Sequence, residues 1–166
     1  MNQILISQLE SLLDKDQTNI KLFREDKISE DNLVQIQKDN FIFIKQFIKE
    51  NGFPFINVSS EKAYRAAFLV IQHSGETAYL QETIDLFNNK TDKEIIKSDL
   101  AYLIDRVRIL NKQLQLYGTQ YRIEHKNVTF FDLEDESNIE KRRKEMNMES
   151  FEDYKKKVKE MIVNKD

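Results

Sequence analysis

The chain has 166 residues, of which 40% are hydrophobic and 33% are charged, and 26 Lys and Arg against 29 Asp and Glu give a formal net charge of −3. This length predicts a single domain over residues 1–166, and the near balance of charges gives no electrostatic reason to expect nucleic acid as a ligand. The absence of Cys excludes disulfides and thiolate chemistry, while 3 Gly and 1 Pro argue against a β-sandwich, a barrel or a glycine-rich phosphate loop.

The first part of the chain carries helical patterns of apolar residues. Leucines at helical spacing predict a helix over residues 4–19. Residues 24–40 are more charged and less regular, and there Asp31 is expected to cap a short helix. Residues 41–49 predict a further helix, which should end at Gly52 because glycine is a common helix stop and a proline follows two residues later.

The middle of the chain predicts three more helices. Ser59 or Ser60 is expected to cap a helix over 63–73 that is apolar nearly all round, so it should be central and covered by other helices. A helix over 77–88 follows, and a capping-box pattern then begins the longest helix, roughly residues 92–114.

In the last part of the chain, the spacing of apolar residues changes from a helical pattern to the alternation that is typical of strands. Residues 120–131 alternate between apolar and polar side chains and predict a β-hairpin with its turn at Lys126-Asn127. A lone hairpin is only marginally stable, so this one must pack on helices. Charged amphipathic helices are expected over 136–145 and 150–163. The predicted fold class is mainly α: a single compact helical domain with a small β-hairpin near residues 120–131.

Membrane, metal and cofactor signals are weak. The first residues lack the basic start and apolar run of a signal peptide, and the apolar stretch 63–71 is too short to span a bilayer, so we expect a cytoplasmic protein without a membrane partner. The two histidines, His73 and His125, lie far apart in sequence and predict no transition-metal site. A carboxylate-bound Mg²⁺ or Ca²⁺ stays open, and no cofactor is indicated.

Polar residues stand at the end of the central apolar helix. Gln72 and His73 occupy its last turn, where the negative end of the helix dipole favours a protonated imidazole. His73 is therefore a candidate general acid/base or anion contact. The simpler alternative is a histidine that caps the helix end or forms a hydrogen bond across the core.

The long helix carries an Asp-Arg pair. Successive helical residues point about 100° apart, so Arg106 should lie near the edge of the apolar stripe and Asp105 should point away from it. Arg106 is a candidate anion clamp and Asp105 a candidate base or orienting group. Alternatively, both belong to a structural ion pair that ties helices together.

The junction between the long helix and the hairpin is polar. Tyr117, Thr119 and Gln120 surround Gly118, which permits a turn, and these side chains either bind a ligand or satisfy the backbone of the turn. The basic run 141–144 is typical of a solvated helix face.

Taken together, these motifs resemble a bacterial protein family catalogued as domain of unknown function 6624. The matching pieces are Asp16-Gln17, Gly52-Phe53-Pro54, Gln72-His73, Asp105-Arg106, Gln115-Leu116-Tyr117-Gly118-Thr119-Gln120 and Arg142-Arg143. Three departures are Phe53 in place of Trp, Lys112 and Leu114 in place of Gly and Pro, and Asn147-Met148 in place of Gly-Leu.

The resemblance implies a site and no reaction. It suggests that the matched polar groups converge on one pocket, with His73 and Asp105 as catalytic residues. The expected substrate-binding residues are Gln72, Arg106, Tyr117, Thr119, Gln120 and Arg143.

Three interpretations remain open. The first is an enzyme that acts on a small anionic molecule by acid–base chemistry. The second is a non-catalytic module that binds a small ligand or a protein partner, as a regulator or an immunity-type protein does. The third is an internal hydrogen-bond network that fixes the register of the helices.

Overall fold

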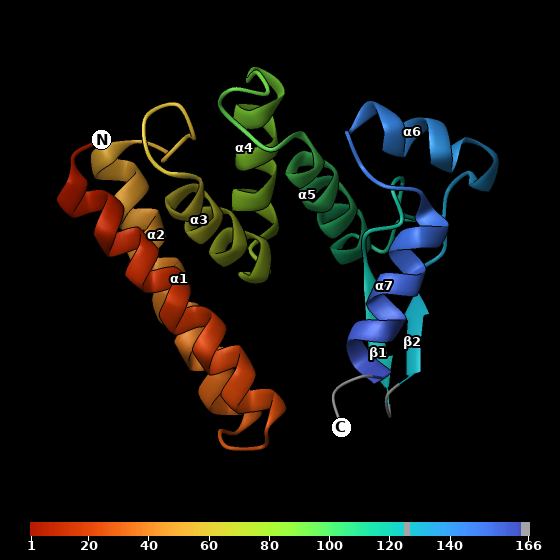
Figure 1. Cartoon of the computed structure of the whole chain (residues 1–166), viewed down its shortest axis with the longest axis horizontal. Coiled ribbons are helices and arrows are strands. Elements are labelled where there is room, and N and C mark those ends of the chain that lie inside the picture. Colours follow the sequence, from red (N-terminus) through yellow and green to blue (C-terminus); the bar gives the residue numbers. More distant parts are fainter. Residues whose placement is uncertain (125–126, 164–166) are drawn as a thin grey trace. The chain divides into compact units, whose positions relative to one another are not determined.

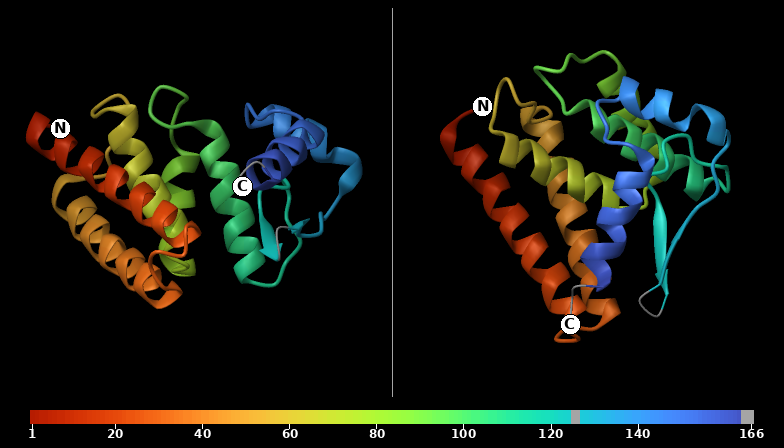
Figure 2. Two further views of the ribbon diagram at one scale, coloured as in Figure 1. Left: turned by 60° about the horizontal axis from the view of Figure 1, so that its bottom comes forward. Right: turned by 45° about the vertical axis from the view of Figure 1, so that its right-hand side comes forward.

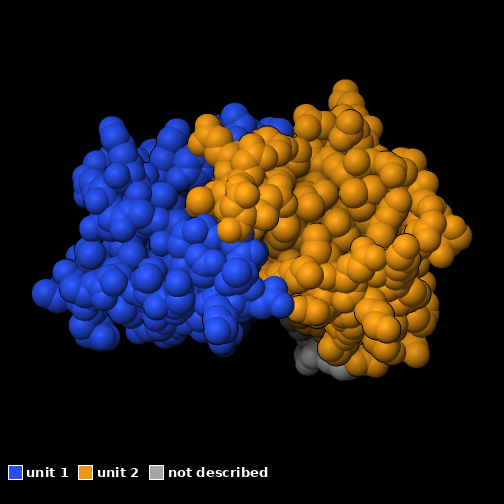
Figure 3. Space-filling model, turned by 90° about the horizontal axis from the view of Figure 1, so that it is seen from above, with its two compact units in different colours: residues 1–79, 90–95 blue, residues 80–89, 96–166 orange. Residues whose placement is uncertain are grey.

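Helices dominate the computed structural model in Figure 1, which describes residues 1–124 and 127–163. The prediction of a mainly α fold with a small antiparallel hairpin is confirmed. The chain forms two compact units, coloured separately in Figure 3: unit 1 comprises residues 1–79 and 90–95, and unit 2 comprises residues 80–89 and 96–166. A single domain over residues 1–166 stays a prediction.

Unit 1 begins with two long helices, α1 (Gln3–Arg24) and α2 (Glu30–Asn51). The predicted break before residue 41 is wrong, because α2 is continuous from its cap at Ser29 to Gly52. No Gly or Pro interrupts residues 30–51, and a charged stretch continues a helix when one of its faces is packed. The stop at Gly52 is confirmed, with a φ of 78° that an L side chain rarely adopts.

The third helix, α3 (Glu61–His73), is the centre of unit 1. Ser60 caps it by accepting a hydrogen bond from the Ala63 amide at 3.0 Å. Helices α1, α2 and α3 contact one another, and α1 and α2 run side by side in Figures 1 and 2. As predicted, α3 is covered on most sides; its buried residues are Ala63, Tyr64, Ala66, Ala67, Phe68, Val70 and Ile71.

Helix α4 (Thr77–Asn88) has the predicted bounds, but the longest predicted helix is shorter than expected. The capping-box residues Thr91 and Glu94 bond as predicted, with the Thr91 amide 3.1 Å from the Glu94 carboxylate. They close a turn, however, and helix α5 spans only Lys97–Leu110. Ile96 is extended before it, and Lys112, with a φ of 59°, leaves the helical path after it.

Unit 2 contains the predicted hairpin, β1 (Tyr121–Glu124) paired with β2 (Asn127–Phe130). Lys126 of the predicted turn lies outside the described residues. The 3₁₀ turn η1 (Glu136–Asn138) then leads into α6 (Ile139–Glu145), and α7 (Phe151–Val163) follows. The hairpin packs on a helix as expected, because the ring of Phe130 lies 5.5 Å from that of Phe151 and 5.9 Å from that of Tyr154 on α7.

Within the described ranges, no helix has both the length and the apolar character needed to cross a membrane.

Candidate functional site

The residues predicted to form a site belong to both units. Gln72 and His73 lie in unit 1. The other predicted residues lie in unit 2: Asp105, Arg106, Tyr117, Thr119, Gln120 and Arg143. The convergence of all of them on one pocket stays a prediction.

In unit 2, Asp105 anchors the loop that follows α5. Its side chain is fully buried, with 0% exposed. One carboxylate oxygen accepts hydrogen bonds from the amides of Leu116 at 2.7 Å and Tyr117 at 3.1 Å. The other accepts from the amide of Thr119 at 3.0 Å and from its hydroxyl at 2.9 Å. The carboxylate therefore holds residues 116–119 against α5.

The environment of Asp105 is that of a structural carboxylate. Burial raises its pKa, while the hydrogen bonds from the loop oppose that rise. Its oxygens are occupied by loop donors, and water does not reach them. Asp105 and Arg106 form no ion pair with each other or with any other residue that the structure describes. A direct catalytic role for Asp105 stays a prediction, and its contacts favour a positioning role.

Gln115 is a member of the family pattern that the predicted site did not include. Its side chain is fully buried and its oxygen accepts from the Gln120 amide at 2.9 Å. Its amide group donates to the carbonyls of Phe131 at 2.6 Å and Gln120 at 3.2 Å. Gln115 thus closes the loop onto the base of the hairpin, as a backbone pair in a sheet would. Its position in the Gln-x-Tyr-Gly-Thr-Gln motif is the sequence feature that could have identified Gln115 as part of this group.

Arg143 clamps the same loop from α6. The guanidinium, in a side chain only 1% exposed, donates to the carbonyls of Tyr117 at 2.6 Å and Glu149 at 2.8 Å. It also lies 5.0 Å from the ring centre of Tyr154, whose hydroxyl donates to the Thr119 carbonyl at 3.1 Å. Burial lowers the pKa of Arg143. These contacts favour a loop clamp over the predicted contact with a substrate.

Gly118 shows how tightly the loop is packed. Its φ is 67°, and a Cβ at this position would lie 2.8 Å from one ring carbon of Phe151 and 3.0 Å from another. Thr119 and Gln120, the two residues after Gly118, are also buried. The side-chain amide of Gln120 donates to the Thr119 hydroxyl at 3.0 Å. The polar groups of the Tyr-Gly-Thr-Gln segment are therefore bonded mainly to Asp105, Gln115, Arg143 and Tyr154. This is an internal network of the kind that the third interpretation describes.

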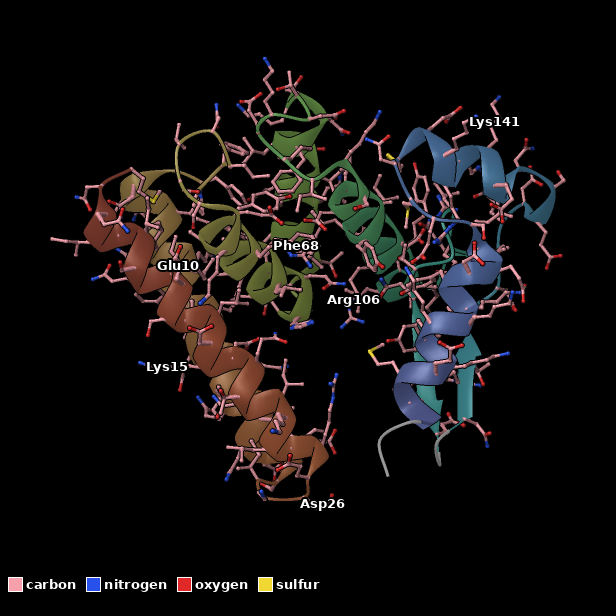
Figure 4. The ribbon with its side chains drawn as sticks, viewed as in Figure 1. Glu10, Lys15, Asp26, Phe68, Arg106 and Lys141 are labelled. Atoms are coloured by element: carbon pink, nitrogen blue, oxygen red, sulfur yellow. The ribbon has the colours of Figure 1, made fainter. Side chains whose placement is uncertain are left out.

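Arg106 differs from its neighbours. It projects from α5 (Figure 4), is half-buried, and makes no hydrogen bond or ion pair with any residue that the structure describes. Its Nε is buried without an acceptor, and burial alone lowers the pKa of the guanidinium. Tyr117 is also half-buried, and burial together with the charge of Asp105 raises the pKa of its hydroxyl. A partly dehydrated guanidinium without a partner is suited to bind a carboxylate or phosphate.

In unit 1, His73 lines a groove of about 930 Å³ beside α2. Lys38, Lys45 and Lys49 of α2 share this groove, and none of the three forms an ion pair or a hydrogen bond with a described residue. The Lys45 ammonium lies 5.6 Å from the ring centre of Tyr79. Gln72, the residue before His73, is half-buried on α3.

The charges of this groove favour an anion. Glu76 is the acidic residue among those that line it, against three lysines and the imidazole of His73. Phe41 and Ile42 of α2 and Tyr79 of α4 add apolar surface to the lining of the groove. The sequence analysis does not group these lysines, because it places Lys38 in an irregular stretch and Lys45 and Lys49 in a separate helix. Their spacing of seven and four residues is the signal that one continuous helix would have given.

Among residues 1–124 and 127–163, no cluster of three or more His, Asp or Glu side chains is arranged to hold a metal ion. The acidic side chains of the two candidate regions are instead bonded to the loop after α5 or stand singly in the groove.

Comparison with known proteins identifies the family. The sequence model of a family of unknown function (DUF6624) matches residues 27–165, so the chain belongs to that family. No curated protein matches the chain. No solved structure matches it either.

Proposed function

We propose that this DUF6624 member is a binding module for anionic molecules and that the groove beside His73 is its ligand site. One observation carries the proposal: three lysines that form no ion pair with a described residue share a concave surface with an imidazole and aromatic side chains. A groove that combines positive charge with apolar surface fits a ligand with an anionic part and an apolar part.

The binding energy has two sources. Each lysine that contacts an anion forms an ion pair in place of contacts with water. At an exposed site this pair contributes modestly to the binding free energy, and the contribution weakens as the salt concentration rises. The apolar surface adds a contribution that does not depend on salt. Binding should therefore fall with ionic strength without vanishing.

A thermal-melting screen tests this proposal. Pyrophosphate, nucleotides, sugar phosphates and citrate are added to the wild-type chain and to the triple variant Lys38→Gln, Lys45→Gln, Lys49→Gln. A ligand at 100 times its Kd should stabilise the fold by about 2.7 kcal/mol. That gain should shrink in the triple variant.

A matched control is available on the other unit. Lys141, Lys144 and Lys156 are exposed and have no ion pair with a described residue, and Lys141 projects from α6 in Figure 4. The variant with all three changed to Gln loses the same charge and should respond to anions as the wild type does. An anion that stabilises all three proteins equally would refute the proposed site.

A second candidate function is catalysis on a small anionic molecule, favoured by Arg106. A half-buried guanidinium without a partner is costly unless a ligand supplies the opposite charge. We propose that Arg106 holds a phosphate or carboxylate in unit 2. Acid–base chemistry by His73, which belongs to unit 1, is a separate prediction.

The two residues are tested separately. If the second candidate is right, Arg106→Gln should abolish stabilisation by small anions, while the change of the exposed Arg24 at the end of α1 to Gln should not. His73→Ala should remain folded and reduce turnover of chromogenic phosphate and carboxylate esters by about 10²–10⁴. If anions act through the lysines and not through Arg106, the first candidate stands and the second falls.

A further inference from the structure

The three groove lysines form one stripe along α2. With about 100° of turn and 1.5 Å of rise per residue, Lys38, Lys45 and Lys49 fall within an arc of about 40°. They follow one another at intervals of seven and four residues, or about 10 Å and 6 Å along the axis. The stripe is therefore a straight row of positive charge about 16 Å long.

Apolar residues lie beside this row of charge. Val34 and Ile42 flank it on either side and are 40% and 66% exposed. Phe41 of the same helix lies beside Tyr79, with the ring centres 5.3 Å apart. Between residues 34 and 49, the acidic residue of α2, Asp39, points to another face and bonds to Gln35. The two exposed aliphatic side chains give the face beside the lysines an apolar area that a partner can cover.

We propose that the lysine stripe is a docking surface for an acidic amphipathic helix of a partner protein. The complementary helix carries carboxylates at i, i+4 and i+11, which repeat the intervals of the lysines when two helices lie antiparallel. Its apolar residues between the carboxylates contact Val34, Ile42 and the Phe41 ring. This inference rests on the proposed anion-binding function and names the class of partner.

The length of the stripe selects a helix over a small anion. A phosphate or a citrate reaches one or two of the lysines, whereas a helix of about 12 residues spans all three. A helix also presents side chains on one face about once every turn. Carboxylates and apolar groups of one partner helix can therefore face the lysines and the aliphatic residues of α2 at the same time.

A displayed library tests the inference. Helical peptides of 18 residues with randomised Glu, Gln, Lys, Leu and Ala positions are selected on the wild-type chain and counter-selected on the variant with Lys38, Lys45 and Lys49 changed to Gln. The expected result is enrichment of sequences with carboxylates four and seven residues apart on one face. Fluorescence anisotropy of an enriched peptide should show a loss of about two- to fivefold in affinity for each lysine removed.

Charge reversal sharpens the test. The variant with the three lysines changed to Glu should reject the enriched peptide and bind its counterpart in which the matched glutamates are lysines. The Gln variant of Lys141, Lys144 and Lys156 should bind the enriched peptide as the wild type does. Circular dichroism confirms that each variant keeps its helix content.

Three results overturn the inference. They are enrichment of acidic peptides without the four- and seven-residue intervals, failure to enrich any peptide, and tighter lysine-dependent binding of anionic vesicles or single-stranded DNA than of the best peptide. If the thermal screen still shows stabilisation by anions through the lysines, the anion-binding function stands and only the helical partner is wrong. If that screen also fails, both proposals fall.

Discussion

Replacing Asp105 by Asn separates a structural carboxylate from a catalytic one. The side chain is fully buried and its two oxygens accept hydrogen bonds from Leu116, Tyr117 and Thr119. An asparagine keeps one acceptor oxygen and places an NH₂ group where the other stood, so backbone donors on that side face another donor. The Thr119 hydroxyl alone can rotate to accept instead.

The size of the effect follows from these contacts. A hydrogen bond to a charged group contributes about 1.5–3 kcal/mol, and the substitution removes about two of them. Relief from burying a charge offsets part of this loss, which leaves a net destabilisation of about 2–5 kcal/mol. In a chain of this size, that lowers the melting temperature by about 5–15 °C.

Urea denaturation followed by circular dichroism measures this loss. Asp92→Asn is the matched control, because Asp92 is exposed and makes no hydrogen bond or ion pair with a described residue. Hydrogen exchange of the Thr119 amide should accelerate in Asp105→Asn and not in the control. Two results together would refute the structural role and support Asp105 as a catalytic base. The Asp105→Asn protein would be as stable as the control, and it would have lost the turnover of chromogenic esters that the wild type shows.

Three further predictions concern unit 2. Gly118→Ala should cost about 2–5 kcal/mol in unfolding free energy, because it adds both a strained φ and a clash with the Phe151 ring; an effect below 1 kcal/mol would mean that the ring moves aside freely. Arg143→Lys should cost about 2–4 kcal/mol, because an ammonium cannot bond both carbonyls in the fork geometry of Arg143; a neutral result in the same urea assay would contradict the clamp. Hydrogen bonds from Asn138 and Ser137 lower the pKa of Asp135 from 3.8 to about 2. The contribution of Asp135 to stability is therefore present above pH 3.8 and is lost as pH falls through about 2; a ¹³C NMR titration with a midpoint near 3.8 would contradict the cap.

The sequence predicted the helices and the hairpin where local physics decides them. The bounds of α4, the cap at Ser60 and the stop at Gly52 follow from short-range hydrogen bonds and from the conformational freedom of glycine. The nearly continuous apolar composition of residues 63–73 likewise predicted that α3 is covered by other helices. These features depend on residues within one or two turns of each other, so a linear pattern is sufficient to find them.

The roles of the polar residues were decided by tertiary contacts. Asp105 and Arg106 are neighbours in sequence, yet one is fully buried under the loop after α5 and the other has no partner in the described chain. Their side chains leave α5 about 100° apart, and only the fold of residues 111–120 determines which of them is covered. The sequence pattern alone assigned both to one site.

The continuity of α2 shows the same limit. A charged segment looks irregular by itself, and α2 is one helix because its other face packs against α1 and α3. The intervals between the lysines can be read from the sequence. They place the lysines on one face only because α2 is a continuous helix, and the rings of Phe41 and Tyr79 lie in the same groove. Amino-acid order therefore determined the local elements and the family. Burial depends on contacts between segments that are distant in sequence, and it decided which polar groups bond within the fold and which have no hydrogen-bond partner in the described chain.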